Sequence, residues 1–295
     1  MKKVIVDIKG GVGNQLFCYA FGYALSRELG MKFYIDTSMP DNDNVKDRKL
    51  ELLNYNVEYD KRISYKYRKN ALLRKLGVNR FCKKAAIGWL TKVYHEKKEY
   101  EYDENVLRIG TSTYFDGFWQ SYKYFDKYKN ELVELLQPRE SRNKSVIDLV
   151  DKIESCNSVS LHVRRGDYIK LGWQLPMDYY KKALERMEEL VGEDMVVYIF
   201  SDDLEYVKEY LRSTKLEKRY RCEYVTYVSD NYVFDDMYIM SKCRHNITAN
   251  SSYSWWGAYL NKNVDKKIIS PVVGMWKREF YMESWECIEV DSQVK

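Results

Sequence analysis

The chain has 295 residues, of which 45% are hydrophobic and 32% charged, and its formal net charge is +5. This length exceeds that of a typical single domain, and the composition excludes a largely disordered chain. The short apolar run at the start contains Asp7, and no apolar stretch approaches the roughly 18 residues of a membrane span. We therefore expect a cytoplasmic protein of two domains.

Six cysteines and three histidines are scattered along the sequence without the spacing of a zinc site or a disulfide framework. We expect reduced thiols, no metal site and no required cofactor. The modest positive charge favours an anionic small ligand, and no nucleic-acid partner is expected.

A strand, a glycine turn and a helix are predicted at the start of the chain. Residues 3–9 are rich in Val and Ile, and the turn Gly10-Gly11-Val12-Gly13-Asn14 precedes a run with helical spacing. Backbone N–H groups at such a turn meet the positive end of the helix, where an anion binds well. Gly11, Gly13 and Asn14 are therefore candidate ligand-binding residues.

A second strand is predicted at 32–36, and its last residue, Asp36, stands where dinucleotide-binding proteins hold a ribose hydroxyl. Leu16, however, occupies a position at which that fingerprint needs a small residue. The match to a dinucleotide-binding site is therefore partial.

The interval 61–95 contains eleven Lys or Arg and no Asp or Glu. Within it, apolar residues at 71–76 fall on one side of a predicted helix and basic residues on the other. A helix resting on an anionic membrane and an ordinary solvated face both fit this pattern. Peripheral contact with the inner face of the membrane through 61–95 therefore stays open.

An aromatic cluster begins at Asp116-Gly117-Phe118-Trp119-Gln120. Aromatic rings beside polar groups are typical of a sugar site, and they are equally typical of a core. If the cluster forms a sugar site, Asp116, Trp119 and Gln120 are candidate sugar-binding residues.

The carboxyl-terminal half alternates between strands and helices. The predicted strands are 158–163, 195–200, 223–228 and 244–249, and the predicted helices are 144–154, 177–190, one ending at 211, 235–242 and 252–260. Such alternation implies a parallel sheet with helices on it. We place one α/β domain at 1–140 and a second, nucleotide-binding one at 141–295.

The strand 158–163 leads directly into Arg164 and Arg165. Ligands of open α/β sheets lie beyond the carboxyl ends of the strands, and arginine donates paired hydrogen bonds to phosphate oxygens. We expect Gly166 to turn the backbone and Asp167 to orient a guanidinium. A surface loop with two solvated arginines is the alternative.

Two further strand ends carry polar residues. Of Asp202 and Asp203, the first is expected to cap the next helix and the second to contact a base or ribose. At Asn250-Ser251-Ser252, hydroxyl and backbone N–H groups at a helix start are suited to a diphosphate.

With these residues identified, the sequence resembles the α-1,2-fucosyltransferases of glycosyltransferase family 11. The resemblance rests on the runs His162-Val163-Arg164-Arg165-Gly166-Asp167 and Ala249-Asn250-Ser251-Ser252-Tyr253-Ser254-Trp255-Trp256-Gly257, with weaker matches in both halves. It implies a GT-B arrangement, meaning two facing Rossmann-like domains with the donor in the interdomain cleft. The first domain would then lie on the acceptor side, with Asp116, Trp119 and Gln120 as its acceptor-side residues.

The resemblance also implies a reaction. L-Fucose would pass from GDP-β-L-fucose to a hydroxyl of a glycan, with inversion and without a metal, in the synthesis of a surface polysaccharide or oligosaccharide. Galactose O2 is the expected acceptor atom, on a free oligosaccharide or a lipid-linked repeat. Arg164 would hold the β-phosphate, with Arg165, Asn14 and the Ser251-Ser252 turn nearby, His162 beside the donor and Asp203 near the guanosine.

Some questions stay open from the sequence. The general base is unassigned among Asp116, Asp36 and a phosphate oxygen of the donor. A dinucleotide-dependent oxidoreductase and a non-catalytic carbohydrate-binding protein are the rival functions, and a different GDP-sugar is an alternative donor. The acceptor glycan and the oligomeric state are not predicted.

Overall fold

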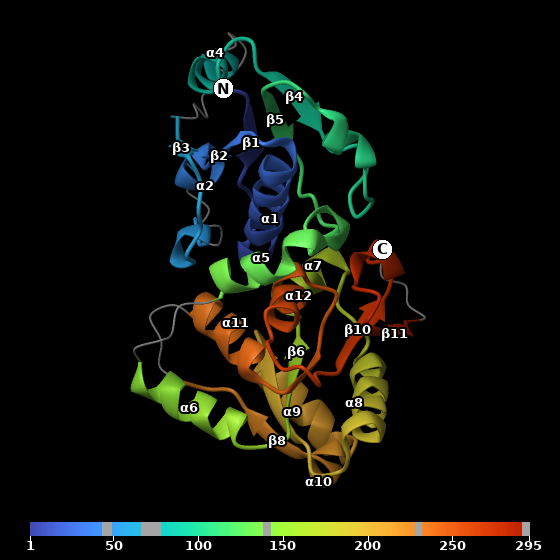
Figure 1. Ribbon diagram of the computed structural model, residues 1–295. Helices are drawn as coiled ribbons and strands as arrows, with labels where there is room; N and C mark the ends of the chain where they lie inside the picture. The colour runs from blue at the N-terminus through green and yellow to red at the C-terminus, as the bar shows by residue number, and fades with distance from the viewer. Residues whose placement is uncertain (43–48, 66–77, 138–142, 228–231, 291–295) are drawn as a thin grey trace. The chain divides into compact units, whose positions relative to one another are not determined.

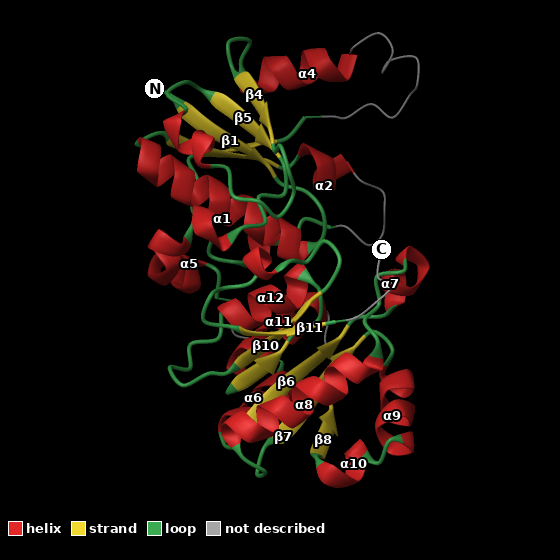
Figure 2. Ribbon diagram, turned by 90° about the vertical axis from the view of Figure 1, so that its right-hand side faces the viewer, coloured by secondary structure: helices red, strands yellow, loops and turns green. Residues whose placement is uncertain are grey.

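The computed structural model describes residues 1–42, 49–65, 78–137, 143–227 and 232–290 (Figure 1). The chain divides into two compact units, Met1–Leu136 and Gln137–Lys295. Each unit contains one sheet in which every pairing between named strands is parallel, with helices packed on it (Figure 2). The prediction of two Rossmann-like α/β domains is therefore confirmed.

The sheet of the first unit has the order β3-β2-β1-β5-β4. Its strands are β1 Lys3–Asp7, β2 Lys32–Asp36, β3 Lys61–Ile63, β4 Lys92–His95 and β5 Thr113–Asp116. From β1, the chain adds β2 and β3 on one side of the sheet, and β4 and β5 then lie on the other side. The strand order thus reverses between β1 and β5. Open α/β sheets bind ligands at such a switch point.

Helix α1, Val12–Leu29, packs closely on this sheet and ends at Gly30 in the left-handed conformation. A Cβ atom on Gly22 would come within 2.4 Å of the Phe33 ring and 2.6 Å of Val6, so glycine is needed for this approach. On the opposite face, Ile87 of α4, Val78–Ile87, joins a cluster with Ile5. The remaining short elements are α2 Ser38–Asn42, η1 Leu52–Asn54, η2 Glu104–Arg108, η3 Tyr122–Tyr124, η4 Asp126–Tyr128 and α5 Lys129–Leu135.

The sheet of the second unit has the order β11-β10-β9-β6-β7-β8. Its strands are β6 Ser158–Val163, β7 Val196–Ser201, β8 Arg221–Tyr224, β9 His245–Ile247, β10 Ile268–Val272 and β11 Glu286–Glu289. The chain proceeds outward from β6 to β8, returns to β9 beside β6, and proceeds outward on the other side. The switch point therefore lies between β6 and β9.

Right-handed crossovers put the helices of the two directions on opposite faces of this sheet. Figures 1 and 2 show α11 and α12 on one face, with α8 and α9 on the other. Side chains of α6, β7 and α11 share one buried cluster. The helices are α6 Lys144–Glu154, α7 Gly166–Leu171, α8 Met177–Val191, α9 Leu204–Ser213, α10 Leu216–Arg219, α11 Tyr232–Lys242, α12 Ser252–Tyr259 and the turn η5 Arg278–Phe280.

The elements predicted from the strongest sequence patterns are present at the predicted residues. The predicted strands 32–36 and 158–163 match β2 and β6, and the predicted helix 144–154 matches α6. The predicted basic helix near 71–76 lies outside the described residues. Of the helices that the structure describes, none has the length and apolar character that crossing a bilayer requires.

Candidate functional site

The arginines predicted to bind an anion follow the carboxyl end of β6. Arg164 Nη2 lies 2.7 Å from Asp167 Oδ1 and its Nη1 lies 2.8 Å from Asp202 Oδ2. The Arg164 side chain is 35% exposed, and these two bonds leave further N–H groups of its five to donate. Arg164 is therefore held in place and still able to bind an anion. The expected pairing of Asp167 with a guanidinium is present.

Arg165 is held more tightly than Arg164. Its Nε donates to Asp203 Oδ2 at 2.9 Å, and its guanidinium carbon lies 3.2 Å from the centre of the Tyr206 ring. Only 15% of the side chain is exposed. Stacking and an ion pair thus fix this guanidinium, which suits a positioning role beside the more open Arg164.

Asp202 does not cap a helix as predicted. Its Oδ1 accepts the backbone N–H groups of Arg165 at 2.9 Å and Gly166 at 3.1 Å. The cap of α9 is Asp203, whose carboxylate accepts the N–H of Tyr206. The cap therefore falls to Asp203, because Asp202 faces the neighbouring strand end and holds Arg164 and the backbone of Arg165 and Gly166 instead. Contact of Asp203 with a nucleoside stays a prediction.

Gly166 is required for a reason that the sequence did not show. It is the first residue of α7, and a Cβ atom there would lie 2.5 Å from Asp202 Oδ2. Glycine is needed because the carboxylate that holds Arg164 comes so close to the backbone.

The second predicted motif follows the carboxyl end of β9. Ser251 caps α12, since its hydroxyl accepts the N–H of Tyr253 at 3.2 Å, and Ser252 begins the helix. Asn250 donates from Nδ2 to the carbonyl of Trp173 at 2.9 Å, while its buried Oδ1 has no hydrogen-bond partner. The positive end of α12 and a polar atom able to bind a ligand therefore lie at this strand end.

Tyr168 connects the two motifs, and sequence reasoning did not single it out. Its hydroxyl donates to the carbonyl of Asn250 at 3.3 Å, and the Arg164 guanidinium lies 5.6 Å from the centre of its ring. Burial raises the pKa of this hydroxyl, against the effect of a hydrogen bond with Ser251. Because β6 and β9 are paired neighbours, this residue joins both sides of the switch point.

His162, the next-to-last residue of β6, is buried and uncharged. Only 6% of it is exposed, and its Nδ1 has no hydrogen-bond partner. Burial, together with the neighbouring Arg164, lowers its pKa to about 3. At neutral pH it can offer a hydrogen bond but no charge.

In the first unit, Asp116 lies at the carboxyl end of β5, beside the end of β1. Its carboxylate accepts a 2.6 Å hydrogen bond from Lys9 Nζ and lies 3.0 Å from His95 Nδ1. Burial alone would raise the pKa of Asp116, but the hydrogen bond and charge of Lys9, together with the charges of Lys83 and His95, outweigh it, so that the pKa is lowered. The group is therefore an ionised, partly exposed carboxylate at the switch point of its sheet.

The glycine turn lies at the same switch point. Gly11 caps α1 without a side-chain bond, and a Cβ atom on it would meet nothing within 4 Å, so its backbone is open to a ligand. Gly13 is buried in the first turn of α1. Asn14 Oδ1 accepts from Gln120 Nε2 at 2.9 Å, which ties the turn to the segment after β5.

Two predicted roles in this unit are wrong. Trp119 has no exposed surface and stacks on Phe21 at 4.2 Å between ring centres, so it is a core residue and not an acceptor contact. Asp36 is fully buried, and its carboxylate accepts bonds from Ser38 and from the Tyr114 hydroxyl. It can neither hold a ribose nor act as a general base.

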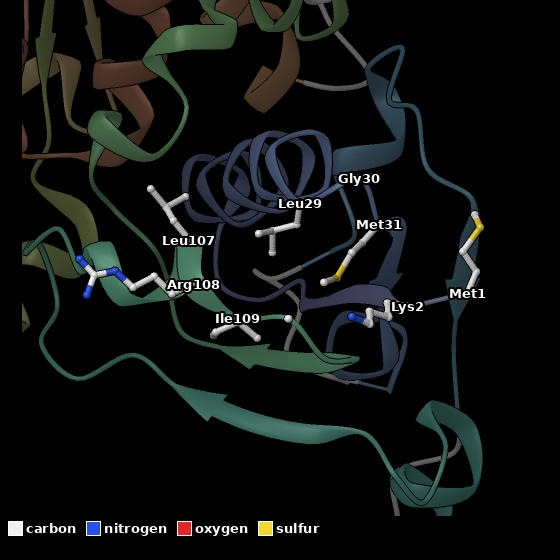
Figure 3. Close-up of a pocket in the computed structure, with 9 residues that line it drawn as sticks. Met1, Lys2, Leu29, Gly30, Met31, Leu107, Arg108 and Ile109 are labelled. Atoms are coloured by element: carbon white, nitrogen blue, oxygen red, sulfur yellow. The ribbon is translucent and has the colours of Figure 1, made fainter.

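A hollow of about 390 Å³ lies away from these strand ends (Figure 3). Its lining precedes β1, β2 and β5 in the chain and includes Lys2, Met31 and Ile109. It therefore lies at the amino ends of the strands, the edge that open α/β sheets do not use for ligands. Among the described residues, no group of three His, Cys, Asp or Glu side chains is arranged to hold a metal ion.

Comparison with known proteins gives the family. The model of glycosyl transferase family 11 matches residues 64–288. The Escherichia coli O-antigen biosynthesis glycosyltransferase WbnK is 33% identical, over 94% of this chain and 98% of its own. An α-1,2-colitosyltransferase of Escherichia coli is 33% identical over 95% and 94%, and a Caenorhabditis elegans putative galactoside 2-α-L-fucosyltransferase is 27% identical over 57% and 50%.

The chain belongs to glycosyltransferase family 11, as its sequence motifs suggested. It is a transferase that moves a glycosyl group from a nucleotide sugar to a glycan acceptor. This excludes the rival predictions of an oxidoreductase and of a non-catalytic carbohydrate-binding protein.

Proposed function

We propose that this protein transfers L-fucose from GDP-β-L-fucose to O2 of a galactose residue, giving an α-1,2 linkage. The observation that carries the proposal is the junction at the β6/β9 switch point. There Arg164 and the start of α12 are joined through Tyr168. A cation and a helix N-terminus beside one tyrosine are suited to a diphosphate leaving group.

The mechanism follows from where negative charge develops. A single displacement at the anomeric carbon breaks the bond to the GDP oxygen while the acceptor hydroxyl forms the new bond, which turns a β-linked donor into an α-linked product. Charge grows on the departing diphosphate. Arg164 and the N–H groups of Ser251 and Ser252 stabilise it without needing to reorganise, so a metal ion is not required.

Arg165, His162 and Asp203 complete the donor side of the proposal. Arg165 Nε and the N–H of Tyr206 hold the two oxygens of Asp203 at the start of α9. Each carboxylate oxygen can accept a further hydrogen bond, and we assign one to the nucleoside. The unpartnered Nδ1 of His162 and Oδ1 of Asn250 are the buried atoms that a bound donor would satisfy.

Gly11, Gly13, Asn14 and Gln120 belong to the first unit. We assign Gly11 and Gly13 to donor binding, Asn14 to catalysis and Gln120 to the acceptor. For the general base, two candidates remain after the exclusion of Asp36, namely Asp116 and a phosphate oxygen of the donor. Asp116 is ionised and thus able to accept the proton of the acceptor hydroxyl.

Colitose is a second candidate for the transferred sugar, because a relative of 33% identity is named as a colitosyltransferase. Colitose is fucose without the 3-hydroxyl, so both donors present the same anomeric carbon and diphosphate. The site residues described above bind the part that the two donors share. Selectivity between fucose and colitose therefore depends on contacts to the 3-hydroxyl. An assay that compares the two donors can measure it.

The test is a transfer assay that compares GDP-fucose with GDP-colitose on a panel of galactosides. We expect turnover with GDP-fucose, an α-1,2 product by NMR, and none with a matched 2-deoxygalactoside. Preference for GDP-colitose would overturn the donor assignment but leave the diphosphate site intact. Turnover with the 2-deoxy acceptor would overturn the linkage.

A further inference from the structure

The first unit exposes four large apolar side chains on a short stretch around the end of α4 and the start of β4. The exposed fractions are 61% for Phe81, 63% for Trp89, 97% for Leu90 and 38% for Val93. Phe81 and Trp89 contact each other edge to face, with 5.5 Å between ring centres. We call these four residues the α4–β4 patch. Clustered exposed aromatic and aliphatic side chains mark a binding surface.

The α4–β4 patch lies in a positively charged stretch of the sequence. The interval 61–95 that contains it has eleven Lys or Arg and no Asp or Glu. Lys84 donates from Nζ to the carbonyl of Thr91 at 2.9 Å, which fixes one positive charge at the base of the turn that carries Trp89 and Leu90. Lys92 is exposed next to Val93. Exposed apolar side chains and cations therefore lie close together along this short stretch.

The position of the patch separates it from the chemistry. Residues 88–91 precede β4, so this turn lies at the amino end of the strand, whereas Asp116 and the glycine turn lie at the carboxyl ends of the parallel neighbours. Occupation of the patch would leave those strand ends open.

We propose that the α4–β4 patch docks on an anionic lipid bilayer, with Trp89 and Leu90 inserted at the level of the headgroups. Tryptophan prefers the membrane interface, and lysine and arginine add attraction to anionic lipids. Charge complementarity selects this partner, since a second copy of the chain would bring the same positive charge to the contact. The transferase would thereby work peripherally at a membrane surface.

Vesicle flotation with the full-length chain tests the proposal. Vesicles of phosphatidylethanolamine and phosphatidylglycerol are compared with vesicles of phosphatidylcholine alone. We expect binding to the first kind only, and weakening as salt rises. The double variant Trp89→Ser/Leu90→Ser should lose about tenfold or more in partition coefficient, since two inserted side chains are removed. The matched control Val264→Ser changes a valine that is 94% exposed in the other unit and should bind as the parent does.

A second measurement keeps the test independent of folding. Trp89 is 63% exposed and the other six tryptophans are buried or partly buried, so brominated lipid should quench mainly its fluorescence. Loss of quenching in Trp89→Phe, with vesicle binding retained, would support insertion. Equal binding of the parent and the double variant would overturn the proposal. So would a parent dimer in sedimentation that the double variant abolishes, because the patch would then be a contact between copies.

Discussion

Replacement of Arg164 by alanine examines the proposed function most directly. The substitution removes the guanidinium that lies between Asp167 and Asp202 and above the ring of Tyr168. We expect the folded structure to survive. The two ion pairs involve a side chain that is 35% exposed, so their loss costs less than about 1 kcal/mol each. Asp202 still keeps its two backbone donors.

The effect on catalysis should be much larger than the effect on stability. Removing one fixed donor aimed at developing negative charge costs about 3–4 kcal/mol, which corresponds to a loss of about 100- to 1000-fold in kcat. The kcat of Arg164→Lys should lie between those of the parent and of Arg164→Ala, because lysine keeps the charge but not the planar guanidinium. The assay is steady-state transfer from GDP-fucose, with thermal unfolding measured on the same samples.

Arg219→Ala is the matched control. Arg219 is also a half-exposed arginine of the second unit with two carboxylate partners, Glu185 and Glu188, but it lies on α10, before the amino end of β8. We expect its turnover to equal that of the parent. An Arg164→Ala variant with kcat within about threefold of the parent would refute the phosphate role, whatever the behaviour of the control.

Further outcomes follow from the same contacts. Tyr168→Phe removes one hydroxyl that joins the two motifs, so the donor KM should rise about fivefold with an unchanged unfolding temperature; an unchanged KM would contradict the link. Gly166→Ala pushes a Cβ atom against Asp202 and should weaken GDP binding in calorimetry, with a stability loss of about 1–3 kcal/mol; normal binding would argue against the close approach. Burial and Arg164 lower the pKa of His162 to about 3, so the unfolded chain takes up a proton there first and the folded state loses stability as pH falls below about 6.5. The free energy of unfolding, measured with denaturant, should fall between pH 7 and pH 5 by about 2 kcal/mol less in His162→Gln than in the parent. An equal fall in both proteins would mean that His162 is not buried in its neutral form. Turnover should not change when a chelator is added, and loss that a divalent cation restores would refute a metal-independent reaction.

Some strands and helices could be predicted from short stretches of the sequence alone. Three apolar residues, two serines and one histidine form a run of six before two arginines, and this run predicts β6 and the cationic strand end. The strand buries all six residues, and the arginines cannot follow it inside. The serines before α12 predict a helix start in the same local way. Strong periodicity, together with alternation of strand and helix, was enough to give the parallel fold.

Weak local patterns hid several elements. β4 and β5 have four residues each, and β5 is a strand because β1 and β4 supply its partners on both sides. β10 contains Pro271, which argues against a strand when read alone. In the sheet, β10 pairs with β9 only at Ile268 and Ile269, so the proline lies beyond that pairing.

Within the candidate site, the sequence by itself determined which residue types stand at the strand ends, since that follows from the order of apolar and polar residues. Only the tertiary structure decided their partners. Asp202 and Asp203 are adjacent carboxylates that look interchangeable in the sequence, and the position of Gly166 against one of them separates their roles. Tyr168 meets Asn250 across 82 residues because two strands distant in the chain are neighbours in the sheet. Such contacts depend on strand order, which a local pattern does not encode.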